Sequence, residues 1–425
     1  MVIREYSKVE LVFSSSESEA VKIALVNLRR DLIRTLDCSV TEKLCKTYVP
    51  VSDESKNADT YEFAGVAAGD ITRILVGTVG NLPELDKKAD ISKLQAEDGT
   101  YRKEAFLIQE KDGELLIAGT DRRGTIYGIY DFCEWLGVSP WYFFADVPVR
   151  RRSEAVIENG YCKVDYPSVE YRGIFINDEE ELEHWVWRYM GETTIGVKTY
   201  EKIFELLLRL KLNYIWPAMH VNSFNLKQEN GALANRMGIV VGTSHCDMLM
   251  RSNNREWKPW LAKKGYTDVE YDFSIPGRNR EILKEYWRES VEQNRDFEVS
   301  YTVGMRGIHD SGFETKSLEG LTGEELLKAK IELLESVMAA QKEILSETLD
   351  TEPMKTFVPY KEVLELYDNG LKVPEDLTLI WTNDNDGYVR RYPGEKEKAR
   401  KSGNGIYYHN SYWAPPGASY LFICS

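Results

Sequence analysis

Two hydrophobic patterns alternate along the first 165 residues of the chain. Apolar residues recur at helical spacing over residues 17–36 and 125–136, which predicts a helix at each place. Short apolar runs predict strands at residues 10–14, 73–79, 105–109 and 115–118. A sheet that carries helices on one side has this combination of patterns. We therefore expect an N-terminal α/β domain over residues 1–165.

From residue 166 the pattern becomes a repeat, in which a short β-type run ends in polar residues and a helical stretch follows. The β-type runs are residues 171–176, 213–216, 239–243, 299–305, 356–359, 377–382, 405–408 and 420–424. Helical spacing is clearest over residues 200–211, 280–295 and 321–345. Eight such runs alternating with helices predict a (β/α)8 barrel of the TIM type over residues 166–425. The alternative, an open doubly wound sheet, would need a glycine-rich phosphate loop after its first strand, where this chain has the acidic FINDEEE.

The charge balance narrows the range of partners. The 425 residues include 69 acidic and 54 basic side chains, which gives a net charge of −15. A surface this acidic repels the phosphates of nucleic acids and the headgroups of acidic lipids. Neither nucleic acid nor a membrane is therefore expected as a partner.

The cysteines and the N-terminus bear on metal binding and on location. None of the six cysteines belongs to a CxxC pair, so neither a zinc site nor a dense disulfide framework is expected. The N-terminus MVIREYSKVELVF lacks the basic segment and long apolar stretch of a secretory signal. The sequence predicts a cytoplasmic protein, or a secreted or periplasmic one if its signal peptide has been removed.

The residues at the ends of the predicted strands carry the candidate chemistry, because barrel active sites form at the carboxyl ends of the strands. In chain order they are Asn177, Asp178, His220, His245, Arg306, Asp310, Tyr360, Glu362, Asn385, Tyr407, His409 and Tyr412. Four of the five histidines of the chain, His220, His245, His309 and His409, follow predicted strands. We expect the strand-end side chains to converge on one pocket.

Each of these residues also has a purely structural interpretation. Asp178 can cap a helix, His245 can be a buried core histidine, and Arg306 can pair only with Asp310. Glu362 can simply begin a helix, where an acidic side chain is favoured. The combination favours acid–base cleavage, since two carboxyl groups across a sugar are the usual equipment of a glycoside hydrolase. The planar guanidinium of Arg306 would suit a carboxylate on the substrate.

The strand-end segments also form long, specific motifs. They are RGIFINDEE, LNYIWPAM, GIVVGTSHC, YTVGMRGIHD, FVPYKEVLELYDNGL, LTLIWTNDNDGYVRR and YYHNSYW. In this order, from about Tyr171 to Trp413, they resemble the α-glucuronidases of glycoside hydrolase family 115. The segment GTDRRGTIYGIYDF resembles the N-terminal domain of the same family, so the resemblance covers nearly the whole chain.

The resemblance implies a fold and an activity. The fold is an N-terminal α/β domain followed by a (β/α)8 barrel. The activity is release of glucuronic acid or 4-O-methylglucuronic acid from side chains of xylan, and some family members act on other acidic plant glycans. The implied mechanism is inversion by two carboxyl groups, with no cofactor and no metal. The substrate would be glucuronoxylan or a related acidic plant polysaccharide or oligosaccharide, and a homodimer is a further expectation.

The resemblance also implies roles for individual residues. Glu362 in PYKE is the expected general acid, whose pKa burial should raise. Asp310 in RGIHD, or Asp178 in FIND, is expected to activate water. The uronate is expected to bind Arg306 or a histidine, and strand alternation predicts that Lys361 points away from the pocket. The expected substrate-binding residues are Asn177, His220, His245, Arg306, Tyr360, Asn385, Tyr407, His409 and Tyr412.

Family members continue past the point where this sequence stops, into a helical bundle and often a β-sandwich. The last helix of the barrel and the C-terminal helical domain are therefore expected to be missing, which would leave apolar surface uncovered near residues 420–425. Two alternatives to a xylan α-glucuronidase stay open. One is a truncated, weakly active or inactive glycan-binding barrel, and the other is the same fold acting on another acidic plant glycan.

Overall fold

The computed structural model describes residues 1–45, 71–177, 179–384, 387–412 and 421–422, with side chains up to residue 410. Contacts within the chain divide it into two compact units. The first comprises Met1–Gly173, Glu201–Asn213 and Arg236–Ile239, and the second comprises Ile174–Tyr200, Tyr214–Asn235 and Val240–Ser425. The domain limits 1–165 and 166–425 remain predictions from the sequence.

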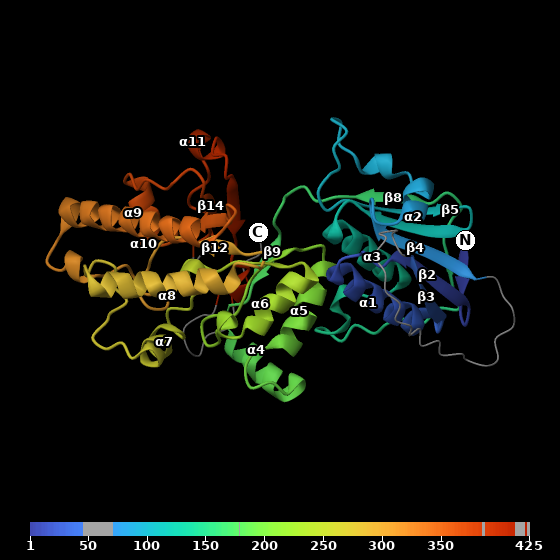
Figure 1. Cartoon of the computed structure of the whole chain (residues 1–425), viewed down its shortest axis with the longest axis horizontal. Coiled ribbons are helices and arrows are strands. Elements are labelled where there is room, and N and C mark those ends of the chain that lie inside the picture. The colour runs from blue at the N-terminus through green and yellow to red at the C-terminus, as the bar shows by residue number, and fades with distance from the viewer. Residues whose placement is uncertain (46–70, 178, 385–386, 413–420, 423–425) are drawn as a thin grey trace, which may run out of the picture. The chain divides into compact units, whose positions relative to one another are not determined.

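The first unit is built around a six-stranded mixed sheet with the strand order β3-β2-β4-β6-β5-β8 (Figure 1). Its strands are β2 Lys8–Ser14, β3 Ser39–Cys45, β4 Thr72–Thr78, β5 Phe106–Lys111, β6 Glu114–Gly119 and β8 Cys162–Asp165. Strand β5 pairs antiparallel with β6 and β8, and the other pairs are parallel. The remaining elements are α1 Glu19–Leu36, α2 Pro83–Lys88, η1 Ile91–Leu94, α3 Arg122–Leu136, η2 Pro140–Tyr142, and the antiparallel pair β1 Val2–Arg4 and β7 Glu154–Val156. The four strands and two helices predicted for this region are confirmed.

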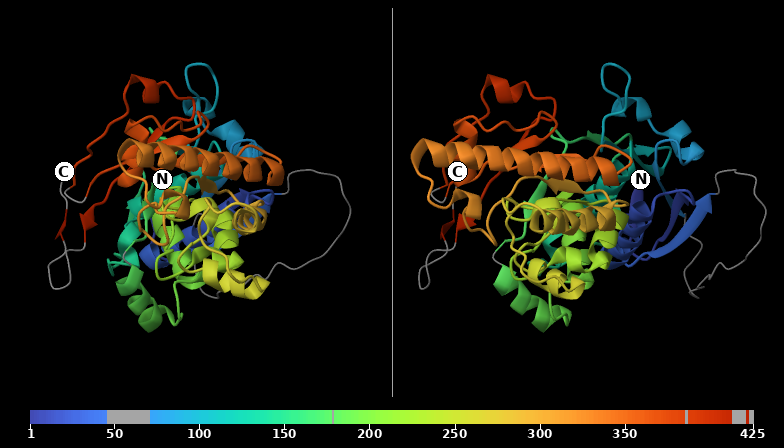
Figure 2. Two further views of the ribbon diagram at one scale, coloured as in Figure 1. Left: turned by 90° about the vertical axis from the view of Figure 1, so that its left-hand side faces the viewer. Right: turned by 60° about the vertical axis from the view of Figure 1, so that its left-hand side comes forward.

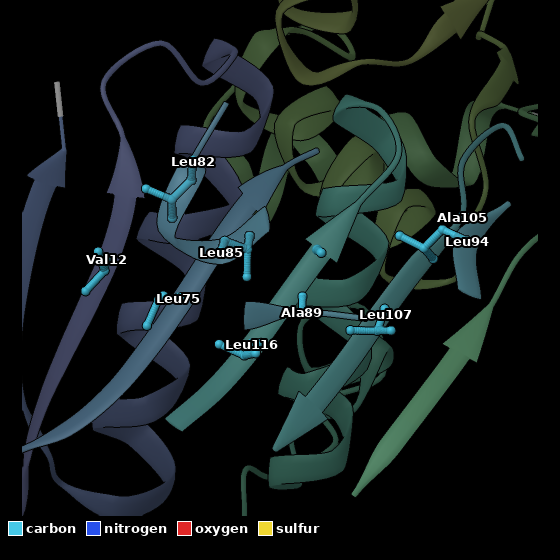
Figure 3. Close-up of a cluster of buried hydrophobic side chains, with 10 residues drawn as sticks. Val12, Leu75, Leu82, Leu85, Ala89, Leu94, Ala105, Leu107 and Leu116 are labelled. Carbon is cyan, nitrogen blue, oxygen red and sulfur yellow. The ribbon is translucent and has the colours of Figure 1, made fainter. Parts of the chain in front are cut away.

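Both faces of this sheet are buried, because its central strands are apolar at successive positions. All four residues of 115–118 in β6 are fully buried, which is typical of a strand covered on both sides. Figure 3 shows the cluster on one face, where Leu116 packs with Leu85 of α2. On the other face, a Cβ atom at Gly128 of α3 would lie 2.9 Å from Ile117 Cγ2. The expectation of helices on one side only is therefore wrong, since alternate residues of a continuous apolar strand each need a cover.

Local capping sets the limits of α3. Asp121 precedes the helix, and its side chain accepts hydrogen bonds from the backbone N–H groups of Arg123 and Gly124. These bonds satisfy donors that the first turn leaves free, so the helix begins three residues before the predicted start at 125. Gly137, with φ 106°, ends the helix in the left-handed conformation that favours glycine.

A buried ion cluster stabilises the first unit. Arg209 Nη2 donates to Asp31 Oδ2 at 2.6 Å and Arg209 Nε donates to Glu205 Oε1 at 2.9 Å. The Arg209 and Asp31 side chains are 2% and 0% exposed. Asp31→Ala would leave the guanidinium buried beside Glu205 alone, so we expect it to lower the free energy of unfolding by roughly 3 kcal/mol.

Chemical denaturation monitored by circular dichroism measures this effect. The control is Glu42→Gln, which removes one partner of the solvent-exposed pair with Arg29 in the same unit. That change should alter the free energy of unfolding by less than about 1 kcal/mol. Equal effects of the two substitutions would contradict a stabilising role for the buried cluster.

The second unit alternates short strands with helices, and its strand order follows the chain order. The strands are β9 Gly173–Phe175, β10 Tyr214–Trp216, β11 Val240–Val241, β12 Ser300–Thr302, β13 Met354–Phe357, β14 Thr378–Thr382 and β15 Asn404–Tyr407. Strands β9 to β11 form one sheet, and β12 to β15 form a second sheet, which is parallel throughout. A parallel bridge between Val241 and Val299 links the two sheets.

The helices of this unit lie between successive strands in the sequence. The α-helices between these strands are α4 Glu179–Trp185, α5 Val197–Arg209, α6 Gln228–Met237, α7 Trp257–Lys264, α8 Arg278–Asn294, α9 Gly323–Thr348, α10 Glu362–Asp368 and α11 Glu395–Lys398. Of these, α5 from Glu201 onward and the last two residues of α6 belong to the first unit. The shorter segments are the π-helix η3 Val186–Met190 and the 3-10 helices η4 Phe224–Leu226, η5 Met248–Met250 and η6 Lys316–Leu318. Helices α8 and α9 run side by side (Figures 1 and 2). Among the described helices, none has both the length and the apolar content to cross a membrane.

The fold is of the mixed α/β type, and seven of the eight predicted β-type runs form strands in the predicted order. The eighth differs, because β17 Leu421–Phe422 pairs antiparallel with β16 Ser411–Tyr412. Only residues 413–420 separate these two strands, which is too short for the crossover that a parallel neighbour requires. The predicted uncovered surface near residues 420–425 falls outside the described side chains, and closure into a barrel stays a prediction.

Candidate functional site

A cavity of about 290 Å³ lies at the carboxyl ends of the strands of the second unit. Its volume is close to the lower end of the usual range for small-molecule sites. The residues that line it follow β9, β10, β11, β12, β13 and β15, as strand-end segments do in parallel α/β folds. They are Phe175, Asn177, Glu179, Met219, His220, Ser244, His245, Cys246, Asp247, Asn254, His309, Asp310, Tyr360, Lys361, Tyr407 and His409.

Asp310 is a carboxylate of this cavity that is bonded by three cationic or histidine side chains. Its Oδ1 accepts from His245 Nε2 at 3.0 Å and from Arg306 Nη1, and its Oδ2 accepts from Lys361 Nζ. Partial burial alone would raise the pKa of Asp310, but the His245 hydrogen bond and the charges of Lys361 and Arg306 outweigh it. Together they hold the pKa of this carboxyl well below its ordinary value. Asp310 is therefore ionised near neutral pH and can accept a proton or orient a water molecule.

His245 is neutral in this arrangement. Burial lowers the pKa of its imidazole despite the neighbouring Asp310. Its Nε2 must then carry the proton that it shares with Asp310, which leaves Nδ1 as an acceptor. This Nδ1 is buried and has no hydrogen-bond partner among the described residues. The ring packs edge-on against Tyr360, with centroids 4.6 Å apart.

Glu362 is the first residue of α10 and is bound by Arg306. Arg306 Nε and Nη2 donate to the two carboxylate oxygens of Glu362, each at 2.8 Å. Such bidentate, charge-assisted pairs are strong and geometrically specific. The sequence predicts that Glu362 carries a proton as the general acid. In the structure both of its oxygens instead accept hydrogen bonds from Arg306. All three nitrogens of Arg306 bind carboxylates of the protein, and its side chain is only 2% exposed.

Asp247 is a second carboxyl in the cavity wall, and its environment is the opposite of that of Asp310. It is 8% exposed. Burial, and then the nearby carboxylates of Glu256 and Glu179, raise the pKa of Asp247 well above its ordinary value. The cavity therefore contains two carboxyls whose pKa values are shifted in opposite directions, Asp310 downward and Asp247 upward. Opposite shifts of this kind are typical of acid–base sites.

Three buried side chains hold the loops around the cavity. Glu179 accepts hydrogen bonds from the backbone N–H groups of residues 220–222, the segment after β10. Asn253 donates to the carbonyl groups of Cys246 and Gly307 and so connects the segments after β11 and β12. Asn383 exchanges hydrogen bonds with the backbone of His409. These amide and carboxylate groups position the loops through hydrogen bonds within the protein.

The Asn383 amide also orients the His409 ring. Its Oδ1 lies 2.7 Å from His409 Nδ1, and because an amide oxygen only accepts, this nitrogen carries the ring proton. Burial, and then the neighbouring His245 and Lys361, lower the pKa of His409 to about 4. His409 is therefore neutral near pH 7, with Nδ1 protonated and Nε2 as its acceptor nitrogen.

His409 should make the stability of the protein sensitive to acid. The ordinary pKa of histidine is 6.5, so between pH 6.5 and about 4 the unfolded chain binds more protons at this residue than the folded chain. Stability therefore falls as the pH is lowered through this window. We expect His409→Gln to show a smaller drop in Tm between pH 6.5 and 4 than the wild type.

Thermal unfolding at several pH values measures the drop. His184→Gln, on α4 and outside the cavity lining, is the control and should retain the wild-type drop. An identical drop in the wild type and in His409→Gln would contradict the assignment.

Two further groupings of side chains bear on metal binding. His245, Cys246 and Asp310 bring three possible ligand atoms within 4.8 Å of one another. Arg306 and Lys361 are bonded to the same Asp310 carboxylate, and their positive charges oppose a cation there.

At the cavity edge His309 Nε2 is hydrogen-bonded to His220 Nδ1, and their ring centroids are 4.0 Å apart.

The structure brings most of the predicted site residues together. Asn177, His220, His245, Asp310, Tyr360, Tyr407 and His409 line the cavity. Arg306 and Glu362 are connected to it through the bonds to Asp310. Asp178, Asn385 and the side chain of Tyr412 lie outside the described part of the chain.

Sequence reasoning missed two cavity residues of particular interest, Asp247 and Lys361. Asp247 follows the predicted third strand by four residues, so its place in the sequence is itself a signal of a strand-end residue. Strand alternation predicts that Lys361 points outward, but β13 ends at Phe357 and the backbone of Lys361 is left-handed, with φ 52°, so the alternation does not extend to it. It lines the cavity.

Comparison with known proteins identifies the family. The model of glycosyl hydrolase family 115 matches residues 164–424, more than half of the chain. A solved family GH115 4-O-methyl-α-glucuronidase with specificity for decorated arabinogalactans is 34% identical, with a TM-score of 0.81 over 98% of this chain and 50% of that chain. This chain thus spans about half the length of that relative.

More distant solved structures resemble the chain weakly. A GH138 enzyme that targets pectin rhamnogalacturonan II is 13% identical, with a TM-score of 0.45 over 89% of this chain and 38% of that chain. A β-N-acetylhexosaminidase from Bacteroides fragilis NCTC 9343 is 12% identical, with a TM-score of 0.46 over 90% of this chain and 67% of that chain. No curated protein matches the sequence. The matched family model and the 34% identical structure together place this chain in glycosyl hydrolase family 115.

Proposed function

We propose that this chain contains the catalytic site of a glycoside hydrolase that releases glucuronic acid or 4-O-methylglucuronic acid side chains from xylan. The observation that carries the proposal is the ionised Asp310 in a strand-end cavity, joined through Arg306 to a second carboxylate, Glu362. Family membership and the solved α-glucuronidase support a glycosidic bond to a glucuronic acid as the bond that is cleaved.

The proposed reaction is hydrolysis with inversion. Water, held by Asp310 or Asp178, attacks the anomeric carbon and forms the new C–O bond while its proton passes to that carboxylate. The glycosidic C–O bond breaks as Glu362 delivers a proton to the leaving oxygen. For this role Glu362 must first take up a proton and exchange an Arg306 hydrogen bond for the glycosidic oxygen. Asn177, His245, Tyr360, Tyr407 and His409 would bind the sugar, together with His220, Asn385 and Tyr412.

The same proposal includes a closed (β/α)8 barrel. Phe175 at the end of β9 and Tyr407 at the end of β15 have ring centroids 5.5 Å apart, so the first and seventh strands end close together. Trp216 of β10 contacts both rings. Side chains from four strands, and from the segment that follows β13, thus pack in one cluster, as in the interior of a barrel.

The glycan that carries the uronic acid is part of the proposal. The solved relative has specificity for decorated arabinogalactans, which supports an acidic plant glycan as the substrate class. Glucuronoxylan is the first member to test and a glucuronic acid-decorated arabinogalactan is the second.

The test is to incubate the purified chain with each polysaccharide and to measure free uronic acid by anion-exchange chromatography. Proton NMR during the first minutes should show the β-anomer of the released acid before mutarotation, because an α-linkage is inverted. Release of the α-anomer first would overturn the inverting mechanism. Binding of the polysaccharide without any release of uronic acid would indicate that the chain is a glycan-binding protein and not a hydrolase.

A further inference from the structure

Lys361 brings a positive charge into the cavity. It is the only lysine or arginine among the described residues that line the cavity. Arg306, the arginine expected to hold a uronate, is 2% exposed and its nitrogens bind Glu362 and Asp310. His245 and His409 are held neutral by burial, which lowers the pKa of each ring. An anionic sugar in this cavity would therefore meet Lys361 as its cationic partner.

The backbone turns Lys361 into the cavity at a cost. Its φ of 52° and ψ of −125° lie in a region that residues other than glycine rarely occupy. Buried residues lie close to it in the sequence: Tyr360, directly before it, packs with Trp216 and Val358, and Val363, two residues after it, is buried in the first turn of α10. Strained residues held by their surroundings are concentrated at ligand clamps and active sites.

The ammonium group also has capacity for a ligand. Lys361 Nζ donates to Asp310 Oδ2, and its side chain is 40% exposed. An ammonium group has three N–H donors, so a bond to Asp310 leaves two for a second carboxylate. A carboxylate bound there would lie beside the Asp310 carboxylate that we propose for water activation, on the same side of the cavity.

We infer that Lys361 binds the carboxylate of the uronic acid and sets the preference of the enzyme for the charged sugar over the neutral hexose. This inference rests on the proposed function, which supplies the uronic acid. The competing explanation is that Lys361 only positions Asp310. The two explanations differ in one respect: a positioning role affects every substrate, whereas a binding role affects only the substrate that carries the carboxylate.

The experiment compares p-nitrophenyl α-glucuronide with p-nitrophenyl α-glucoside, which differ only in the group at C6. We expect Lys361→Gln to lower kcat/KM for the glucuronide on the order of 100-fold, mainly through KM, as when one member of a hydrogen-bonded charge pair is lost. The weak activity on the glucoside should change less than about 3-fold, since the removed charge has no partner on that sugar. Lys361→Arg should recover most of the glucuronide preference, because it keeps the charge.

The matched control is Lys316→Gln, which removes an exposed lysine paired with Glu270 outside this cavity. It should leave both substrates unaffected. Equal losses on the glucuronide and the glucoside in Lys361→Gln would overturn the inference in favour of positioning. Failure of the wild type to cleave any glucuronide would instead refute the proposed function.

Binding of free glucuronate and of glucose, measured by isothermal titration calorimetry, tests the inference without turnover. Lys361→Gln should lose glucuronate affinity and keep its response to glucose. Unchanged glucuronate affinity in a variant with wild-type Tm would overturn the assignment.

Discussion

Glu362→Gln is expected to remove most release of uronic acid from glucuronoxylan while sparing much of the activity on an aryl α-glucuronide. The sugar oxygen that leaves from xylan is a poor leaving group and needs a proton as the bond breaks, whereas a nitrophenolate leaves without one. Loss of a general acid typically lowers the rate by about 10²–10⁴-fold. We expect a loss in this range on xylan and less than about 10-fold on the aryl substrate.

The comparison is made from kcat/KM on both substrates. Glu365→Gln is the control, because this exposed residue lies on the same helix and outside the cavity. It should be fully active. Since Glu362→Gln also removes the charged partner of the buried Arg306, Tm must be measured alongside to separate catalysis from folding. Wild-type activity on xylan would refute the acid role of Glu362, and Asp247, the cavity carboxyl with the raised pKa, would then be the acid to test.

Asp310→Asn should lower activity on both substrates by the same factor, about 10²–10⁴-fold. Attack by water is required whatever the leaving group, so loss of the group that activates water cannot depend on the aglycone. The asparagine side chain also lacks the negative charge to which Arg306, Lys361 and His245 are hydrogen-bonded in the wild type.

The ratio of kcat/KM on the two substrates is the measurement. Asp368→Asn, at the end of α10 and paired with Arg391, is the control and should be active on both. A loss confined to xylan would identify Asp310 as the acid and reverse the two proposed roles. An equal and large loss on both substrates, with an unchanged Tm, is the expected result.

The features that the sequence predicted well depend on short-range patterns. Helical spacing located α1, α3, α8 and α9, and short apolar runs located the strands of both units. Residues after those strands could be grouped because the carboxyl ends of parallel strands share one edge of a sheet. The cavity contains seven of the predicted residues for that reason.

The features that the sequence did not predict depend on long-range pairing and on single backbone angles. The bond between Arg306 and Glu362 joins residues from different strand ends and leaves no local signal. The raised pKa of Asp247 depends on burial next to Glu256 and Glu179, which only the folded chain brings together. The antiparallel pairing of β17 likewise depends on its partner β16 and not on its own apolar residues.

The left-handed conformation of Lys361 places stability and selectivity in conflict at one position. Its strain costs on the order of 1–3 kcal/mol, and glycine would relieve it at a backbone-entropy cost of roughly 0.5–1 kcal/mol. A laboratory evolution experiment that screens only for heat resistance would therefore favour glycine at residue 361. The resulting protein would be harder to unfold and less able to distinguish an acidic sugar from a neutral one. A thermostability screen of this protein therefore has to select for activity on a uronic acid substrate as well.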